Sequence, residues 1–334
     1  MNLGTGSVFV SVPLLTLPGR NGLNYSVSLV SSSQAWNLAG NSTASIGMYL
    51  TRTGAVTFKP SGSIVLSNNP DIRCIGGYAF TDENGGAHTF SQPIQTGCWS
   101  MSSCQNPGGC VAQPSYNNLG GTDERGEGIS VDLIACKLTL KTGVWFPLTG
   151  CSTVNTMGGA AYLPYTVTME NPNGNAITSF GAGSNGTDMD SLGRKITFST
   201  SGATTTIQYY DSNYNSQTIK VTYGTQSQSG TCSYHTSQQG NVNSPVNVIG
   251  NASAVLPNGL SYIFQYDQCG TLNKVVYPSG GYTRYQFDYS NYTHILTPPT
   301  SNPRVTGTDV ELVQKYVCRQ APASLFLACI IRKA

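Results

Sequence analysis

The sequence predicts an all-β protein, an array of antiparallel β-hairpins divided into two β subdomains. Many short segments alternate apolar and polar residues with the period of two that is typical of strands. Clusters of Gly, Asn, Asp and Pro separate these segments at turn positions. In Leu256–Tyr289 the pattern recurs every ten or eleven residues, which indicates consecutive hairpins.

The stretch Leu256–Tyr289 contains three copies of one plan. Each copy opens on a turn that contains a glycine, because a glycine adopts a positive φ angle without steric cost. Seven residues after each of these turn glycines the sequence has an aromatic residue, and Asp267 directly follows the first aromatic residue, Tyr266. We therefore expect a structural role for the following residues: Gly259, Tyr266, Asp267, Gly270, Tyr277, Gly280 and Phe287.

Two of these copies predict which side chains are buried. In the first, Leu260, Tyr262, Phe264 and Tyr266 alternate with Ser261, Ile263 and Gln265. In the third, Thr283, Tyr285 and Phe287 alternate with Tyr282, Arg284 and Gln286. The first set of each copy should face a core, and the second should face the solvent.

Part of this stretch resembles a known family. The run FQYDQCGTL at 264–272, followed by VYPSGG at 276–281, is similar to the tyrosine–aspartate (YD) repeat of bacterial RHS proteins. The resemblance implies a secreted or surface-exposed β shell, which in complete members winds into a hollow cocoon around a C-terminal toxin. It also implies partners, namely further repeats or a toxin domain of the same or a linked polypeptide.

Three other segments resemble the same family. Ser11–Trp36 has a Pro-Gly-Arg turn between two strands and a closing Trp, and Tyr78–Phe90 has an Asn-Gly turn between aromatic strands. The third resemblance lies in NPNGNAI at 171–177 and DMDSLGR at 188–194, which are similar to the family's tandem turns.

Changes in composition suggest the domain organisation. We expect an N-terminal β region over 1–223, with a Cys/Gly-rich insertion at 97–121 that disulfides staple. A Ser/Gln/Asn-rich linker at 224–247 separates it from the YD-repeat strands at 248–300. The tail at 301–334 is predicted to be irregular or helical, because apolar residues at 310, 312, 313 and 316 have a spacing closer to that of a helix.

Composition narrows the classes of partner. Only 10% of the 334 residues are charged, the net charge is +2, and no basic run occurs, so we expect no nucleic-acid partner. No apolar run reaches the roughly 18 residues of a membrane helix. The 19 tyrosines and three tryptophans (36, 99 and 145) could stack on surface glycans, although cross-strand packing is the commoner role of such residues.

The ten cysteines suit an oxidising compartment, because disulfides persist there. Small buried thiols are the alternative. Cys98 and Cys110 flank a Gly/Pro-rich loop, which makes them the preferred pair for a bridge. No signal peptide is visible at the start of the chain, so a secreted or cell-surface location is inferred from composition and resemblance.

The motifs that could indicate catalysis or cofactor binding each lack a required element. GAGSNG at 181–186 matches GxGxxG, but another turn follows it where a dinucleotide site needs a helix. Asp188, Asp190 and Gly193 are similar to a calcium loop, but Ser199 stands where a bidentate Glu is needed, so turns with Asp-to-amide bonds are expected. The three histidines, His88, His235 and His294, lie too far apart for a zinc site.

These observations predict no catalytic residue, cofactor or metal, and therefore no enzyme. We expect a non-enzymatic, exported RHS/YD-repeat shell fragment that encloses or presents a partner domain such as a toxin. The alternative is a secreted carbohydrate-binding or adhesive β domain.

Overall fold

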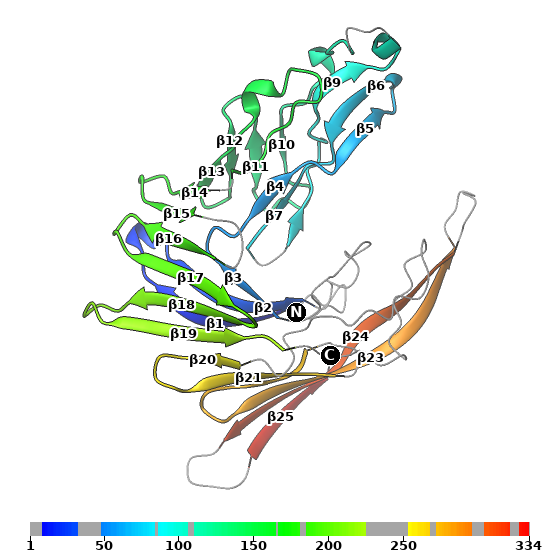
Figure 1. Ribbon diagram of the computed structural model, residues 1–334. Coiled ribbons are helices and arrows are strands. Elements are labelled where there is room, and N and C mark those ends of the chain that lie inside the picture. Colours follow the sequence, from blue (N-terminus) through cyan, green and yellow to red (C-terminus); the bar gives the residue numbers. More distant parts are fainter. Residues whose placement is uncertain are drawn as a thin grey trace. The chain divides into compact units, whose positions relative to one another are not determined.

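The protein is described by a computed structural model, which contains two compact units (Figure 1). The first unit comprises Met1–Leu15, Val27–Leu50 and Phe198–Ala334, and the second comprises Thr16–Ser26 and Thr51–Thr197. The structure describes residues 9–32, 48–83, 86–105, 110–164, 166–180, 185–224, 253–267, 272–295, 304–320 and 327–333. The predicted linker at 224–247, apart from residue 224, lies outside them, as do Gly270 and the segment 181–184 of the GxGxxG match.

The predicted fold class is confirmed. The described residues form β-strands and short 3₁₀ turns, with no α-helix among them, and every pairing between adjacent strands with a described register is antiparallel.

The second unit holds two three-stranded sheets and a run of sequential strands. The sheets have the orders β4-β7-β8 and β5-β6-β9, and β10 to β16 are hydrogen-bonded in chain order. The bounds are β4 (Thr57–Lys59), β5 (Gly62–Leu66), β6 (Asn69–Gly76), β7 (Ala79–Thr81), β8 (Ala87–His88), β9 (Thr96–Ser100), β10 (Gly120–Thr122), β11 (Ser130–Asp132), β12 (Lys137–Thr139), β13 (Trp145–Pro147), β14 (Val167–Glu170), β15 (Ala176–Phe180) and β16 (Gly186–Asp190). The 3₁₀ turns are η1 (Arg20–Gly22), η3 (Ser102–Gln105), η4 (Pro114–Tyr116) and η5 (Cys151–Thr153).

Aromatic side chains form the core of the second unit. The Phe58 ring stacks on Tyr78 at a centroid distance of 5.1 Å and meets Phe90 edge-on at 6.2 Å. The ring centroids of Phe80 and Phe146 are 6.1 Å apart, and both side chains are almost fully buried. Because β4, β7 and β13, which carry Phe58, Phe80 and Phe146, are only 3 residues long, such large rings supply most of the apolar area that each of them can bury.

The first unit contains a second run of sequential strands. Its strands β18 to β25 are also hydrogen-bonded in chain order. The bounds are β18 (Thr204–Tyr210), β19 (Ser216–Thr222), β20 (Ser253–Val255), β21 (Ser261–Tyr266), β22 (Leu272–Val276), β23 (Tyr282–Ile295), β24 (Arg304–Gln320) and β25 (Leu327–Lys333). Four further strands contain boundaries between the units: β1 (Phe9–Leu17), β2 (Tyr25–Ser32) and β3 (Tyr49–Arg52), which form one sheet, and β17 (Lys195–Ser201).

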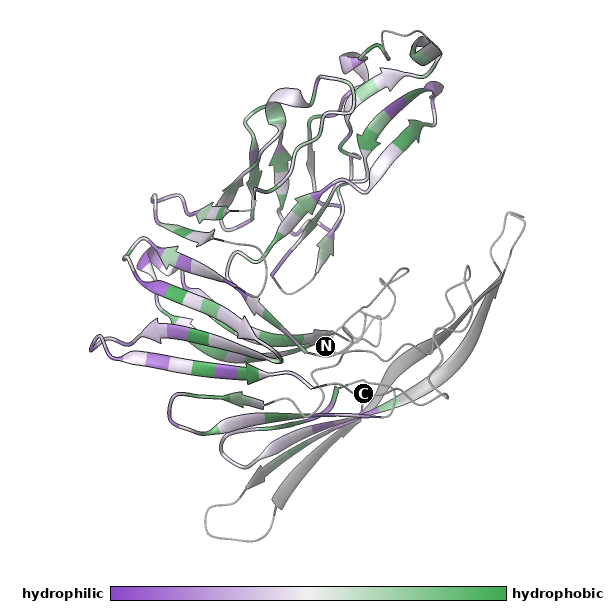
Figure 2. Cartoon of the chain, in the orientation of Figure 1, coloured by the Kyte–Doolittle hydropathy of each residue, from purple (hydrophilic) through white to green (hydrophobic). Residues whose placement is uncertain are grey.

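The strands of the first unit bury one face, as the alternation predicts, except at Leu260, which ends the turn before β21 and is 49% exposed. Ile207, Ile219, Val221, Phe264 and Val275 are buried at 0 to 1% exposure, and Figure 2 shows hydrophobic and hydrophilic residues alternating along β18 and β19. In the third repeat copy Thr283 and Tyr285 are buried, whereas Arg284 and Gln286 are exposed.

One hairpin turn recurs through both units. Its first residue donates its amide to the carbonyl of the fifth residue and accepts a bond from the amide of the fourth, and the fourth has a positive φ angle. This geometry is a three-residue loop, a type I turn followed by a left-handed residue. Six described turns have it, each after an even-numbered strand: 140–144, 171–175 and 190–194 in the second unit, and 211–215, 256–260 and 277–281 in the first.

The fourth residue of these turns is glycine in five cases and tyrosine in one. The glycines, with φ between 74° and 84°, are Gly143, Gly174, Gly193, Gly259 and Gly280. The positive φ angle predicted for Gly259 and Gly280 is therefore found. The exception is Tyr214, with φ 59°.

This exception allows a paired prediction on stability. Gly259→Val should lower the free energy of unfolding by about 1 kcal/mol or more, because φ is +80° there while an added Cβ would meet nothing within 4 Å. Tyr214→Gly should raise it by about 1 kcal/mol, because it relieves the same strain. Urea denaturation of both variants provides the test, and two changes of the same sign would contradict it.

The prediction of an irregular or helical tail is wrong for 304–320, which form β24. This strand pairs with β23 along the whole length of β23. Gln286 lies opposite Gln314 and Phe287 opposite Leu312, so Val313 is an extra residue at a β-bulge. Val310 and Leu312 are paired with Tyr289 and Phe287, whereas Tyr316 is paired with Arg284, so the positions with helix-like spacing do not share one face of the strand.

The preferred bridge in the 97–121 region is also wrong. The disulfides there are Cys74–Cys98 and Cys104–Cys110, and a third joins Cys136 to Cys151. Cys98 lies on β9, which pairs with β6, the strand that contains Cys74. Sheet pairing therefore brings Cys98 to a partner 24 residues earlier in the chain. Cys318 is disulfide-bonded as well, and no described cysteine is free.

Candidate functional site

Three charged or polar side chains meet in the interior of the second unit. Asp188 on β16 is completely buried, and the Tyr25 hydroxyl on β2 donates a short hydrogen bond to its Oδ2 atom. Arg52 on β3 places its Nε atom 3.4 Å from the same oxygen, and its side chain is only 10% exposed. The sequence brings Asp188 inward because it alternates along β16 with exposed Met189.

Burial dominates the electrostatics of this cluster. It raises the pKa of Asp188 above its ordinary value, while Arg52 and the hydroxyls of Tyr25 and Ser179 act in the opposite direction. Burial also raises the pKa of Tyr25, and the carboxyl group of Asp188 adds to the increase. The tyrosine therefore stays a neutral donor, and the cluster is held together by one ion pair and one hydrogen bond.

A second acid lies on the loop after β7. Burial raises the pKa of Glu83, and the Gly54 amide donates to its Oε2 atom at 3.4 Å. The Thr51 hydroxyl donates to the Glu83 carbonyl in a short bond. An added Cβ at Gly54 would contact Ser179 Oγ at 3.6 Å, which places Glu83 and Asp188 around one small region. Because Asp188 and Tyr25 have no exposed surface, this arrangement ties strands together and offers no surface to a solute.

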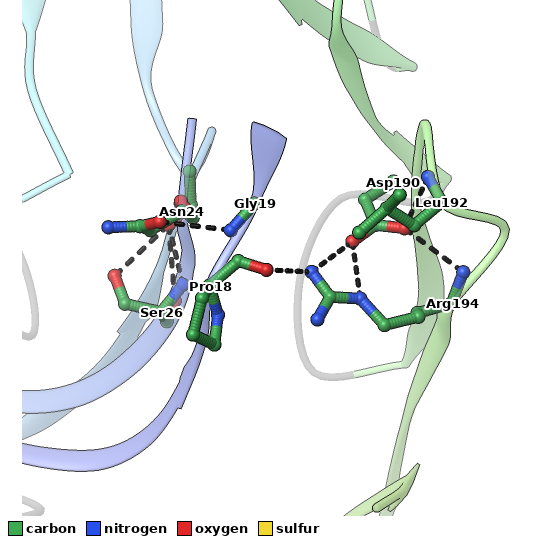
Figure 3. A network of polar contacts seen from close by, with 8 residues as sticks. Pro18, Gly19, Asn24, Ser26, Asp190, Leu192 and Arg194 are labelled. Carbon is green, nitrogen blue, oxygen red and sulfur yellow. Dashed lines mark hydrogen bonds and ion pairs between the residues drawn. The ribbon is translucent and has the colours of Figure 1, made fainter. Parts of the chain in front are cut away.

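The Asp-Ser-Leu-Gly-Arg turn at 190–194 carries a separate network (Figure 3). Asp190 Oδ1 accepts the amides of Leu192 and Arg194, each at 3.0 Å. The Arg194 guanidinium binds Asp190 Oδ2 through Nε at 2.7 Å and Nη2 at 2.6 Å, and it donates to the Pro18 carbonyl at 2.8 Å. The turn thus holds the Pro-Gly-Arg turn that follows β1.

The two aspartates of the calcium-loop pattern belong to different networks, Asp188 to the buried cluster and Asp190 to the turn at 190–194. Asp190 forms the predicted Asp-to-amide bonds, but Asp188 does not, because it points into the interior toward Tyr25 and Arg52. Among the described residues no group of three or more His, Cys, Asp or Glu side chains could hold a metal ion.

Of the three histidines of the sequence analysis, His235 lies outside the described residues, His294 lies in β23, and His88 ends β8. Its ring lies between two carboxylates, with Nε2 3.0 Å from Asp82 Oδ2 and Nδ1 2.5 Å from Glu127 Oε2. The ring also lies 5.7 Å from Phe80. This trio connects the loop that contains Asp82 with the loop that contains Glu127.

Of the predicted repeat residues, all but Gly270 lie within the described residues. Gly259 and Gly280 occupy the left-handed position of their turns. Tyr266 ends β21, and its hydroxyl oxygen accepts a hydrogen bond from the Met48 amide at 3.3 Å. Asp267 follows it, and Phe287 lies in β23. Tyr277 precedes the last turn and shares a hydroxyl bond of 2.9 Å with Thr283.

Sequence reasoning missed Tyr25 and Arg52. Tyr25 lies within the segment Ser11–Trp36, but no motif distinguishes it from other strand tyrosines. Arg52 and Asp188 are far apart in the sequence, and only the packing of β3 near β16 makes them partners.

Buried tyrosines predict a loss of stability in alkali. Burial raises the pKa of Tyr25, Tyr266 and Tyr285 above the ordinary value of 10.0. A group whose folded-state pKa is raised contributes stability that is present below its unfolded pKa and is lost as the pH rises further. Between pH 8 and pH 10.5 these three tyrosines should lower the free energy of unfolding by about 2 kcal/mol. Urea denaturation at both pH values tests this, and equal stabilities would contradict it.

Comparisons with known proteins identify no family for this chain. No protein-family model matches the chain, and no curated protein matches it. Among solved structures it is similar to the "Crystal Structure of TcdB2-TccC3 without hypervariable C-terminal region", with 10% sequence identity and a TM-score of 0.17. The match covers 93% of this chain and 17% of that chain. A superposition at this score does not establish a common fold. In the described residues no helix is long and apolar enough to span a membrane.

Proposed function

We propose that this chain is a non-enzymatic, exported segment of an RHS/YD-repeat shell, which encloses or presents a partner domain such as a toxin. The observation that carries the proposal is the recurring three-residue turn. It closes alternate connections of sheets whose strands follow chain order, including the Asp-x-Leu-Gly-Arg and Tyr-Pro-Ser-Gly-Gly segments that resemble the family.

A sheet built of consecutive hairpins is suited to form the shell of an enclosure. Each hairpin buries its apolar face only with its neighbours, and identical turns let hairpins be added without changing the sheet. The three described disulfides, together with disulfide-bonded Cys318, favour an oxidising compartment and hence export. The polar cluster around Asp188 is buried, and Asp190 forms hydrogen bonds within its own turn, which favours a structural role over catalysis.

The genomic region that encodes the chain provides the test. We expect coding sequence in the same or a linked reading frame for further Tyr- and Gly-containing repeats and for a separate C-terminal domain. Co-expression of that domain with the repeats should protect it from limited proteolysis, compared with the domain expressed alone.

Equal digestion in the two preparations would contradict enclosure. Absence of such coding sequence, together with glycan binding by the isolated chain, would favour the carbohydrate-binding alternative. The isolated chain should also show no hydrolase activity toward peptide, ester or glycoside substrates.

A further inference from the structure

The turn between β18 and β19 differs from the five other three-residue turns in the residue at its left-handed position. Tyr214 occupies the left-handed position that glycine occupies in the five equivalent turns. A bulky residue with positive φ is disfavoured by its Cβ. The side chain gains no compensating burial, because Tyr214 is 87% exposed. Backbone strain of this kind is concentrated at functional sites, so the outlier calls for a role outside folding.

A second observation concerns the rest of the tip. Tyr210 is 59% exposed, and Ser212, Asn213, Asn215 and Ser216 are exposed as well. The hairpin tip therefore presents two aromatic rings among small hydroxyl and amide side chains. It has a single ionisable carboxylate, Asp211, whose two oxygens accept bonds from the Asn213 and Asn215 amides and from the Gln217 side chain.

We propose that this hairpin tip, Tyr210–Ser216, is a binding site for neutral carbohydrate chains. An exposed tyrosine offers an apolar ring face for the C–H face of a sugar and a hydroxyl that can hydrogen-bond. The neighbouring Asn and Ser side chains both donate and accept, as sugar hydroxyls do. No cation belongs to the tip, so an anionic ligand would find no counter-charge there, and the oxygens of Asp211 are occupied by hydrogen bonds within the turn.

A protein partner is the competing possibility, because Tyr, Ser and Asn are also common in antibody loops. Protein hot spots, however, lie in well-packed, desolvated surroundings. The tip contains no aliphatic side chain that could supply such surroundings, and every residue from Ser212 to Ser216 is exposed. The composition and exposure therefore favour carbohydrate. This inference does not depend on the shell proposal, and either can fail without the other.

The test measures retention of the whole chain on immobilised neutral polysaccharides (a glucan, a mannan and a galactan) and on an acidic one (a polyuronate). The variants are Tyr214→Gly and Tyr210→Ser. Tyr162→Ser is the matched control, because Tyr162 is 46% exposed but belongs to the other unit. Thermal unfolding of each variant shows whether the fold is intact, and Tyr214→Gly should melt no lower than the unchanged protein.

We expect binding to at least one neutral polysaccharide, a tenfold or greater loss of affinity in Tyr214→Gly and in Tyr210→Ser, and no change in Tyr162→Ser. Unchanged affinity in the two tip variants would overturn the proposal, as would binding to the acidic polymer alone or to none of the four. The proposal would also be overturned if the chain bound none of the polysaccharides but bound a protein, and the two tip substitutions abolished that binding. This result would indicate a protein partner.

Discussion

Replacing Asp188 by Ala is expected to lower the free energy of unfolding by about 4 kcal/mol. The substitution leaves the Arg52 guanidinium, which is only 10% exposed, without the carboxylate 3.4 Å away. It also removes the acceptor of the buried Tyr25 hydroxyl. A buried charge without its partner retains its full desolvation penalty, which explains why the loss should exceed that of an ordinary hydrogen bond.

Two further variants separate the charge from the packing. Tyr25→Phe should cost about 1 kcal/mol, because it removes only the hydroxyl. The double variant Arg52→Met/Asp188→Leu should recover most of the stability lost in Asp188→Ala, because it removes both charges and keeps the volume. Chemical denaturation provides all three values. A double variant no more stable than Asp188→Ala would show that the ion pair is not the source of the effect.

Removal of the Cys74–Cys98 disulfide is expected to cost about 3.5 kcal/mol, the entropy of a loop of this length in the unfolded chain. The two cysteines are 24 residues apart, and both are buried in a small core with Leu66 and Ile72. Replacement of both by Ala keeps that core apolar, so the measured loss should reflect mainly the cross-link.

The Cys104–Cys110 bridge is the matched control. It closes a loop with a separation of only 6 residues, and its removal should cost about 2 kcal/mol. Both cysteines lie outside the buried core. Urea unfolding of the two double variants compares them directly, and an equal or larger loss for Cys104→Ala/Cys110→Ala would contradict the prediction. Native protein should also react with a thiol reagent at none of the six cysteines in the three described bridges.

Local patterns in the sequence were sufficient for the fold class. Period-two alternation identified the buried face of the first and third repeat copies, because each strand side chain points to the face opposite its neighbours. Glycines at turns identified the left-handed positions at 259 and 280, because only glycine adopts them without strain. Both signals act over a few residues, so one sequence contains them in full.

The tail shows where a local pattern misleads. Apolar residues at 310, 312, 313 and 316 belong to one strand, in which pairing with β23 places Tyr316 opposite Arg284 and therefore on the other face from Val310 and Leu312. Pairing with β23 selects the strand, because the ladder satisfies backbone groups along its whole length. That partner is not visible in the tail's own residues.

The sequence by itself determined an all-β chain of hairpins and most of the turn glycines, since alternation and turn chemistry are local properties. Only the tertiary structure decided which cysteines pair, because sheet pairing rather than loop length brings Cys98 to Cys74. Only the tertiary structure also placed Asp188 with Tyr25 and Arg52, because the strands that carry them are distant in the chain and meet through packing. Contacts of this kind depend on the whole fold, and no short segment encodes them.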